Sequence, residues 1–404
     1  MKRILFVDDE PDVLEGLKNL LRKQRAIWDM TFVGNGAAAL AALAAAPFDV
    51  IVSDMRMPGM DGAALLQRVL TDFPHIVRIV LSGQTEQEVA RRLVHVAHQF
   101  VSKISDGAAL QTVIERACNL QELLAQPTLR QAVGEVKQLP VKPALYTRLV
   151  ELLENPNSST ADVAAVIERD IGTSSKLLQV VNSAFFGLPT RVGDVRTAVS
   201  YLGMEMVKML ALSVEMRQSQ SHVKPCPGFN IDSLQEHGLR SARIARKLLP
   251  DRMGAQDAFS AAMLQDSGML VLLGRLPEVF GKIVKDVRES RRPVCEVELA
   301  TLGVTHAEIG AYLLGIWGLP YGIVEGVAFH HNPSRAVSTG LDVPGAVHIG
   351  SALAEELVPQ DPAKSLRPGV TLDMDYLAKF DLTKQLPAWR DMAKRELSGA
   401  RASR

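Results

Sequence analysis

Cysteine is scarce in this sequence. Only three occur among 404 residues, Cys118, Cys226 and Cys295, and no two of them form a CxxC pair. Widely separated single cysteines exclude a disulfide framework or a thiol-rich metal site. We therefore expect a protein of a reducing, cytoplasmic compartment.

A surplus of one charge sign is also absent, because 45 basic residues balance 45 acidic ones. Such a chain has no overall field to attract nucleic acid or an anionic membrane, so we expect neither as a direct partner. Long apolar runs are missing too, since Pro47 and Asp49 interrupt the alanine-rich stretch that follows Gly36. The short apolar run behind the basic start leads straight into acidic residues, unlike a signal peptide.

The length predicts at least two domains. In the first third, short apolar runs alternate with segments of helical periodicity through five cycles, as in "RILFV" followed by "PDVLEGLKNLLRKQ". Apolar strands that alternate with helices predict a doubly wound, five-stranded parallel sheet of the α/β class. From about residue 127 onward the pattern is helical throughout, and residues 194–216 and 255–276 each read as one apolar-rich helical segment.

Charged and polar residues follow the predicted strands at their carboxyl ends. Asp8 and Asp9 follow the first strand, Asp54 ends the third, Ser82 the fourth and Lys103 the fifth. In a doubly wound sheet these ends lie along one edge, where ligands bind. Adjacent carboxylates repel each other unless a cation lies between them, and oxygen ligands suit Mg²⁺. The sequence therefore predicts a site for magnesium and a phosphoryl group.

The motifs "FVDDE", "SDMRMPGMDG", "VLSG" and "QFVSK" resemble those of response-regulator receiver domains. This resemblance implies that Asp54 is the phosphoacceptor, phosphorylated by a sensor histidine kinase. It also implies that Asp9, Asp54 and the backbone carbonyl of Arg56 bind Mg²⁺, with Asp8 assisting through water.

The same resemblance assigns switch roles to residues near the last two strands. Ser82 would move to the phosphoryl group, Lys103 would contact a phosphoryl oxygen, and Phe100 would pack inward on activation. The family usually has proline after the lysine, often in a cis peptide bond, whereas this chain has Ile104. Because a cis bond costs far more before a residue other than proline, we expect a trans bond and a different placement of Lys103.

The second region resembles the HDOD domain, a helical relative of HD-type phosphohydrolases. The resemblance is carried by "LPVKPALYTRLVELL", "VIERDIGTSSKLLQVVNSAFFG", "AVSYLGMEMVKMLAL", "EVELATLGVTHAEIGAYLLGIWGLP" and "VAFHHNP". Catalytic HD enzymes hold metal with a histidine, a His-Asp pair and a later aspartate. His237 matches the first ligand, but Gln265–Asp266 replaces the pair and Ser351 falls at the last position.

A neutral amide is a weak ligand for such a metal, and the loss of a carboxylate removes compensating charge. We therefore expect no metal in the HDOD domain and no hydrolase activity. The scattered histidines are interpreted first as helix residues satisfied by nearby partners, with His330–His331 suited to a helix end. A second interpretation is a polar pocket for a ligand or partner, formed by Asn182, His237, Asp266, Glu298, His306 and His331.

We predict a receiver domain over residues 1–122, a linker over 123–138, an HDOD domain over 139–335 and a helical C-terminal extension with a tail over 336–404. The leading hypothesis is a phosphorelay response regulator. Phosphorylation of Asp54 would control a non-catalytic HDOD domain that binds an unidentified protein partner. The sequence leaves the choice between monomer and homodimer open.

Two alternatives belong to other functional classes. One is a receiver-gated phosphodiesterase for cyclic dinucleotides, against which Gln265 and the missing "GYP" signature argue. The other is a DNA-binding regulator, because "IERDIGTSSKLLQVVNS" resembles a helix-turn-helix. Its second helix, however, carries only Lys176 as a basic residue and otherwise presents an apolar face, whereas a recognition helix needs several cations.

Overall fold

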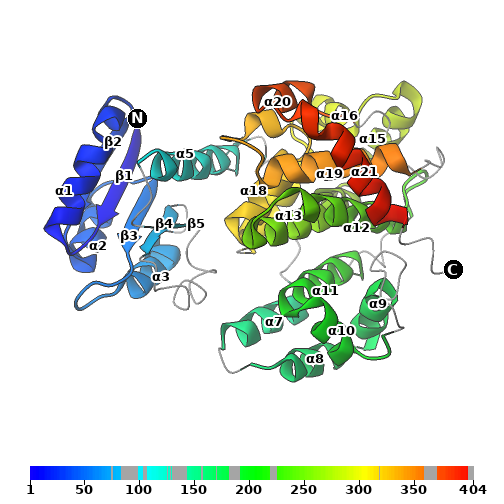
Figure 1. Cartoon of the computed structure of the whole chain (residues 1–404), viewed down its shortest axis with the longest axis horizontal. Coiled ribbons are helices and arrows are strands. Elements are labelled where there is room, and N and C mark those ends of the chain that lie inside the picture. The colour runs from blue at the N-terminus through cyan, green and yellow to red at the C-terminus, as the bar shows by residue number, and fades with distance from the viewer. Residues whose placement is uncertain are drawn as a thin grey trace. The chain divides into compact units, whose positions relative to one another are not determined.

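The computed structural model describes residues 1–404 except 74–75, 83–98, 103–106, 125, 128, 130–142, 156–157, 170, 182–191, 219–224, 318, 359–370 and 399–404. The chain divides into two compact units (Figure 1). Unit 1 comprises Met1–Leu123 with Gly318–Tyr321, and unit 2 comprises Leu124–Trp317 with Gly322–Arg404. Each unit is described by itself.

Unit 1 is built on the predicted alternation of strands and helices. In chain order its elements are β1 (Lys2–Val7), α1 (Pro11–Leu20), η1 (Arg22–Ala26), β2 (Trp28–Val33), α2 (Gly36–Ala45), β3 (Val50–Asp54), α3 (Gly62–Asp72), β4 (Val77–Ser82), β5 (Gln99–Ser102) and α5 (Gly107–Leu124). The predicted helix between β4 and β5 lies outside the described residues.

The five strands form one parallel sheet in the order β2-β1-β3-β4-β5, which confirms the predicted fold class. One face of the sheet is covered by α2 and α3, whose Leu43, Leu65 and Val69 pack in one core with Leu5 and Ile51 of the strands. The connection from β1 leads to β2 on one side of β1, and the connection from β2 leads back to β3 on the other side. Because both connections are right-handed, α1 lies on the face opposite to α2 and α3. Burial on both faces explains why the strands are continuously apolar.

Unit 2 is helical throughout its described residues. Its elements are α7 (Ala144–Glu154), α8 (Thr160–Glu168), α9 (Ile171–Val181), α10 (Val195–Leu202), α11 (Met204–Gln218), α12 (Ile231–Leu248), α13 (Arg252–Leu264), α14 (Ser267–Arg275), α15 (Pro277–Ser290), α16 (Val294–Leu302), α17 (His306–Ile316), α18 (Tyr321–Phe329), η3 (Pro333–Arg335), α19 (Val343–Leu357), α20 (Met374–Lys379), η4 (Thr383–Gln385) and α21 (Leu386–Ser398). Helix α12 packs against α13 and α19, and α14 packs against α17.

Two segments that we predicted as single helices are each divided, so those predictions were wrong. Residues 194–216 form α10 and α11, separated at Gly203, whose φ of 84° a residue with a side chain rarely adopts. Residues 255–276 form α13 and α14, separated by a turn at Gln265–Asp266. The apolar pattern continues on both sides of each break, because each of the four helices contributes buried apolar residues.

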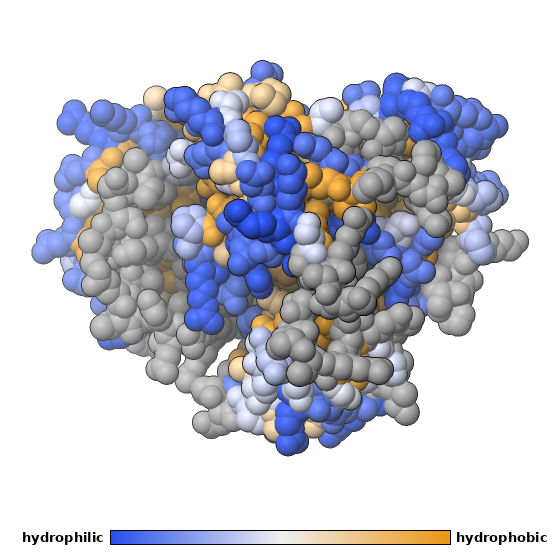
Figure 2. Space-filling view, turned by 45° about the vertical axis from the view of Figure 1, so that its right-hand side comes forward, coloured by the Kyte–Doolittle hydropathy of each residue, from blue (hydrophilic) through white to orange (hydrophobic). Residues whose placement is uncertain are grey.

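The residues beyond 335 belong to the same compact unit as the preceding helices, since α19 lies against α12 and α13 and α21 lies against α12. Figure 2 shows hydrophilic residues over much of the face drawn, with smaller apolar patches between them. Among the described residues, no single helix is both long and apolar enough to cross a membrane. Helices α16 and α17 reach that length and composition only as a pair bent by 78°.

Candidate functional sites

Three carboxylates meet at one edge of the sheet in unit 1. Asp8 and Asp9 directly follow β1, and Asp54 is the last residue of the neighbouring strand β3. One oxygen from each residue lies within 4.8 Å of the others. Asp8 and Asp54 are buried and Asp9 is partly exposed, so the cluster, which we call the acid edge, is reached from one side.

Backbone donors hold two of these carboxylates in place. The amide N–H of Glu10 donates to Oδ1 of Asp8 over 3.0 Å, and that of Arg56 donates to Oδ2 of Asp54 over 3.1 Å. A glycine allows the loop after β3 to fold closely, because a Cβ on Gly62 would lie 2.1 Å from the carbonyl oxygen of Asp54. Backbone donors and the close packing of this loop therefore hold the carboxylates of Asp8 and Asp54 in position.

A pocket adjoins the acid edge. Its lining residues are Asp9, Met55, Arg56, Met57, Pro58, Asp61 and Ala63. Several carboxylate oxygens beside a solvent-accessible pocket are the donor set that a hard cation such as Mg²⁺ prefers, and they leave room for water or a phosphoryl group. The residues present thus fit magnesium by their chemistry.

The remaining predicted receiver residues are only partly described. Ser82 ends β4 and pairs with Ser102 of β5, and Phe100 lies within β5, but neither side chain is among those the structure describes. Lys103 and Ile104 lie outside the described residues, as does Asn182 of the predicted helical pocket. Their roles stay predictions.

In unit 2, three of the four positions compared with HD enzymes, His237, Gln265 and Ser351, belong to one hydrogen-bonded network. Nε2 of His237 lies 2.9 Å from the hydroxyl of Ser351 and 3.1 Å from that of Ser241. The amide of Gln265 donates to Ser241 over 3.4 Å, and Nδ1 of His237 lies 3.3 Å from a carboxylate oxygen of Glu355. We call these residues the His237 network.

Close helix packing brings the network together. A Cβ on Gly350 of α19 would lie 2.7 Å from the carbonyl oxygen of Ser241 on α12, so only glycine allows this approach. The next residue, Ser351, consequently reaches His237. Sequence reasoning missed Ser241 and Glu355. The signal for Ser241 was its position four residues after His237, which places these two side chains on one face of a helix.

Gln265 and Asp266 are neighbours in sequence but face different groups. Gln265 joins the His237 network, whereas Oδ1 of Asp266 lies 3.4 Å from Nε2 of His306. The turn between α13 and α14 causes this divergence. Close packing of α14 on α17 adds to it, because a Cβ on Gly268 would lie 2.0 Å from the carbonyl oxygen of His306.

His306 is the centre of a second buried polar group. It is the first residue of α17, whose N-cap Thr305 forms a capping box with Glu308. Oε2 of Glu298, on α16, accepts from Nδ1 of His306 over 2.7 Å and from its backbone N–H over 2.8 Å. Burial alone would lower the pKa of His306, but the carboxylates of Glu298 and Asp266 outweigh it and raise the pKa to about 9.

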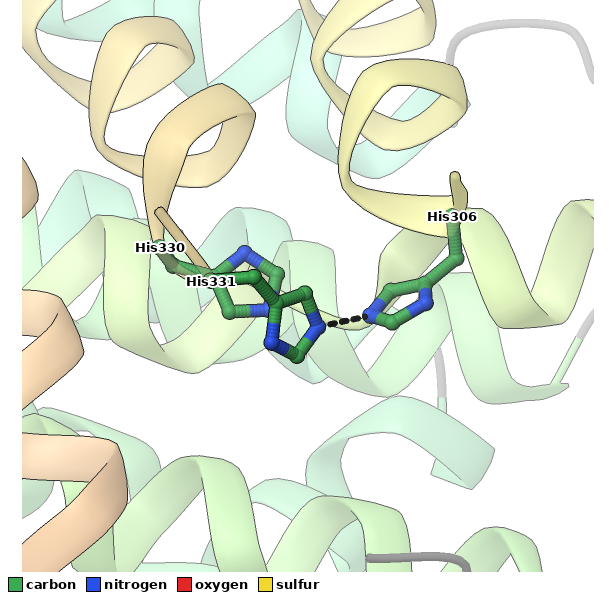
Figure 3. A group of neighbouring side chains, drawn as sticks. All are labelled: His306, His330 and His331. Carbon is green, nitrogen blue, oxygen red and sulfur yellow. Dashed lines mark hydrogen bonds between the residues drawn. The ribbon is translucent and has the colours of Figure 1, made fainter. Parts of the chain in front are cut away.

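Two further histidines complete the group, at the end of α18 (Figure 3). Nε2 of His331 lies 3.0 Å from Nε2 of His306. His330 is buried and donates from Nδ1 to the carbonyl oxygen of Val327 over 2.8 Å. We call His306, His330 and His331 the histidine cluster; the structure thus brings together four residues of the predicted pocket, Asp266, Glu298, His306 and His331.

His348 anchors the histidine cluster from outside. Its Nδ1 donates to the carbonyl oxygen of His330, and its Nε2 accepts from the backbone N–H of Asp373, each over 2.8 Å. Burial lowers the pKa of His348, which favours this neutral form with one donor and one acceptor nitrogen.

Comparison with known families matches both parts of the chain. A response regulator receiver domain matches residues 4–115, and an HDOD domain matches residues 139–333. An uncharacterized protein of Treponema pallidum is 28% identical over 212 residues, which are 52% of this chain and 40% of that protein. The hydrogenase transcriptional regulatory protein HoxA of Cupriavidus necator is 28% identical over 180 residues, 41% of this chain and 37% of that protein.

The chain thus spans 40% or less of the length of these two relatives. Among solved structures, a candidate signal transduction protein from Marinobacter aquaeolei VT8 superimposes with a TM-score of 0.52 at 20% identity, over 83% of this chain and 82% of that one. This likeness concerns the fold. The two family matches show that the chain combines an N-terminal response regulator receiver domain with a C-terminal HDOD domain.

Proposed function

We propose that Asp54 accepts a phosphoryl group from a sensor histidine kinase, and that this modification controls the HDOD domain. The observation that carries the proposal is the convergence of Asp8, Asp9 and Asp54 within 4.8 Å at a pocket. Three like charges so close together favour a bound divalent cation. A phosphoryl group arriving at Asp54 adds further negative charge that the same cation offsets.

In this proposal each residue has a distinct task. Asp54 is the nucleophile, and one of its carboxylate oxygens forms the bond to phosphorus while the histidine nitrogen of the kinase leaves. Asp8, Asp9, Asp54 and the carbonyl of Arg56 would hold Mg²⁺, which supplies charge neutralisation during phosphoryl transfer. Ser82 and Lys103 would contact the phosphoryl oxygens, and Phe100 would repack when they do.

We infer that the HDOD domain is a non-catalytic output module. The position that corresponds to the metal site of HD enzymes contains His237 with neutral hydroxyl and amide groups from Ser241, Gln265 and Ser351, and its one carboxylate, that of Glu355, lies 3.3 Å from Nδ1 of His237. Hydroxyl and amide oxygens compete poorly with imidazole and carboxylate for a transition metal. A protein partner that distinguishes the two phosphorylation states would then receive the signal.

Binding to DNA through α9 is not favoured by the packing of that helix. Leu177 and Val181, on the face that would enter a groove, are fully buried. A recognition helix must expose its reading face to the bases. We therefore assign α9 to the core of the helical unit.

The test uses acetyl phosphate and Mg²⁺ with the full chain, read by intact mass. We expect one phosphoryl group on the wild-type protein and none on Asp54→Asn. The matched control is Asp61→Asn, since Asp61 lines the same pocket and caps α3, and asparagine caps a helix equally well. Phosphorylation of Asp54→Asn, or its loss in Asp61→Asn as well, would contradict the proposal.

The same samples test coupling to the HDOD domain. Hydrogen exchange with a beryllium fluoride mimic should change on specific helices of unit 2 in the wild-type chain and not in Asp54→Asn. An unchanged unit 2 would show that the receiver domain does not control the output domain.

A further inference from the structure

The histidine cluster places three imidazoles on one small volume. One ring nitrogen from each of His306, His330 and His331 lies within 4.8 Å of the other two. The rings come from two elements, with His306 opening α17 and the pair following α18 (Figure 3). His306 and His330 are buried and His331 is half-buried, so the group is mostly shielded from water.

Hydrogen bonds on the far side of two rings fix which nitrogen faces the cluster. Nδ1 of His306 donates to Glu298, and Nδ1 of His330 donates to the carbonyl of Val327. A metal that binds Nε2 of His306 must displace the proton on that nitrogen, and Nε2 then carries the lone pair, as in histidines that bind metals. A carboxylate or carbonyl on the opposite nitrogen is the usual support of such a ligand.

The distance between one nitrogen of His306 and one of His331 is also close to the distance between two ligands of one metal ion. Nε2 of His306 and Nε2 of His331 are 3.0 Å apart. Two nitrogens bound to one tetrahedral zinc ion at ~2.0–2.1 Å are themselves about 3.3 Å apart. A shift of a few tenths of an ångström converts the observed pair into two ligands of one ion.

The charge around the cluster is negative. Glu298, which is fully buried, contacts His306 from one side, and Oδ1 of Asp266 lies 3.4 Å from Nε2 of the same ring. Once His306 has lost its extra proton, these two carboxylates compensate the charge of a divalent ion. Asp266 also lines a small pocket with Arg217 and Gln235.

We propose that His306, His330 and His331 bind a divalent transition metal of the zinc class, with Asp266 beside the ion. Imidazole nitrogen selects such metals over magnesium, whereas the acid edge offers oxygen only. From the sequence we expected no metal in the HDOD domain, and this proposal departs from that expectation. Asp266, one of the positions compared with HD enzymes, lies beside the cluster, whereas Gln265 belongs to the His237 network. It does not depend on phosphorylation of Asp54.

The test is metal binding to the full chain after removal of any affinity tag, with excess Mg²⁺ present to occupy the acid edge. We expect one equivalent of Zn²⁺ by elemental analysis, and visible d–d absorption of a low-symmetry site when Co²⁺ is added instead. In His331→Gln the affinity for Co²⁺ should fall at least 100-fold. The matched control, His237→Gln, removes a buried histidine outside the cluster and should retain the absorption.

Far-ultraviolet circular dichroism shows that both variants are folded before they are compared. Failure of the wild-type chain to take up Zn²⁺ or Co²⁺ would overturn the proposal. Equal affinity of His331→Gln and the wild type would overturn it too, as would equal loss in both variants. Because Asp54→Asn leaves the cluster intact, that variant should bind Co²⁺ normally whether or not the receiver is phosphorylated.

Discussion

The acid edge of unit 1 and the histidine cluster of unit 2 differ in which charges lie next to each other. At the acid edge, Asp8, Asp9 and Asp54 bring like charges within 4.8 Å. In unit 2, Glu298 and Asp266 instead lie at 2.7 and 3.4 Å from nitrogens of His306. The first arrangement brings like charges together, which favours a bound cation, whereas the second places a positive imidazolium between its carboxylates, a charge that the proposed metal would replace. The difference explains why the first is visible in sequence as consecutive acids, while the second is assembled by packing.

The largest expected effect concerns a feature that both sites share, a glycine that touches the backbone of a site residue. A Cβ would lie 2.1 Å from the carbonyl oxygen of Asp54 in Gly62→Ala, and 2.0 Å from that of His306 in Gly268→Ala. Backbone atoms cannot yield cheaply, so we expect each change to lower the free energy of unfolding by about 3 kcal/mol. Urea denaturation followed by circular dichroism measures the loss.

Two other helical glycines are the controls. No atom lies within 4 Å of a Cβ on Gly16 of α1 or on Gly281 of α15. Alanine there should stabilise each unit by about 0.5–1 kcal/mol, because glycine is a poor helix residue. If Gly62→Ala or Gly268→Ala behaved like its control, the close approach would not exist.

Glu298→Gln tests whether unit 2 supplies its own counter-charge. The amide still accepts a hydrogen bond from His306 but no longer offers a negative charge to the buried ring. We expect a loss of about 2 kcal/mol in the free energy of unfolding, since one partner of a buried ion pair is removed. Chemical denaturation at pH 7 is the measurement.

Glu308→Gln is the comparison for that change, because Glu308 caps the same helix and glutamine also serves in a capping box. Its ion pair with the half-exposed Arg335 is weak, so the cost should stay within about 0.5 kcal/mol. Equal effects of the two variants would show that the Glu298–His306 contact contributes no more than a surface pair.

The smallest expected effect concerns Asp257, a carboxylate of unit 2 that has other carboxylates nearby. Burial, together with the charges of Asp251 and Glu205, raises the pKa of Asp257 to about 7. A raised pKa means that the folded state holds the proton more tightly, so this group lowers stability as pH rises from about 4 to 7. Asp257→Asn should therefore stabilise the chain by about 1–2 kcal/mol at pH 8 and by almost nothing at pH 4.

Thermal unfolding of Asp257→Asn at both pH values checks the sign. Asp391→Asn, on an exposed face of α21, is the control and should show little difference between them. A stabilisation of Asp257→Asn that is larger at pH 4 than at pH 8 would contradict the raised pKa.

The parallel sheet was predictable because its strands are short apolar runs separated by helical segments, and five such cycles are too few for an eight-stranded barrel. The acid edge followed from it, since adjacent parallel strands end together, Asp8 directly follows β1 and Asp54 ends β3. The division at Gly203 was not predictable from the apolar pattern, because the buried face continues through α10 and α11. Only the positive φ of the glycine reveals it.

The histidine cluster was predictable in part. Glu298, His306 and His331 were recognised as a candidate group, but the role of His330 was not, since a histidine at a helix end is explained equally well by the helix dipole. The position of Asp266 depends on the turn before α14 and on the contact of Gly268 with α17. Contacts of that kind arise from the crossing of helices and leave no periodic signal in the chain.

The turn at Gln265–Asp266 has a consequence for how unit 2 can change over evolution. A single peptide bond joins a residue of the His237 network to a residue beside the histidine cluster. Insertion or deletion of one amino acid here would rotate one of the two side chains out of its group. A change in the length of this turn would therefore disturb the two groups together, so they inherit a shared constraint although no hydrogen bond in the structure links Gln265 to His306.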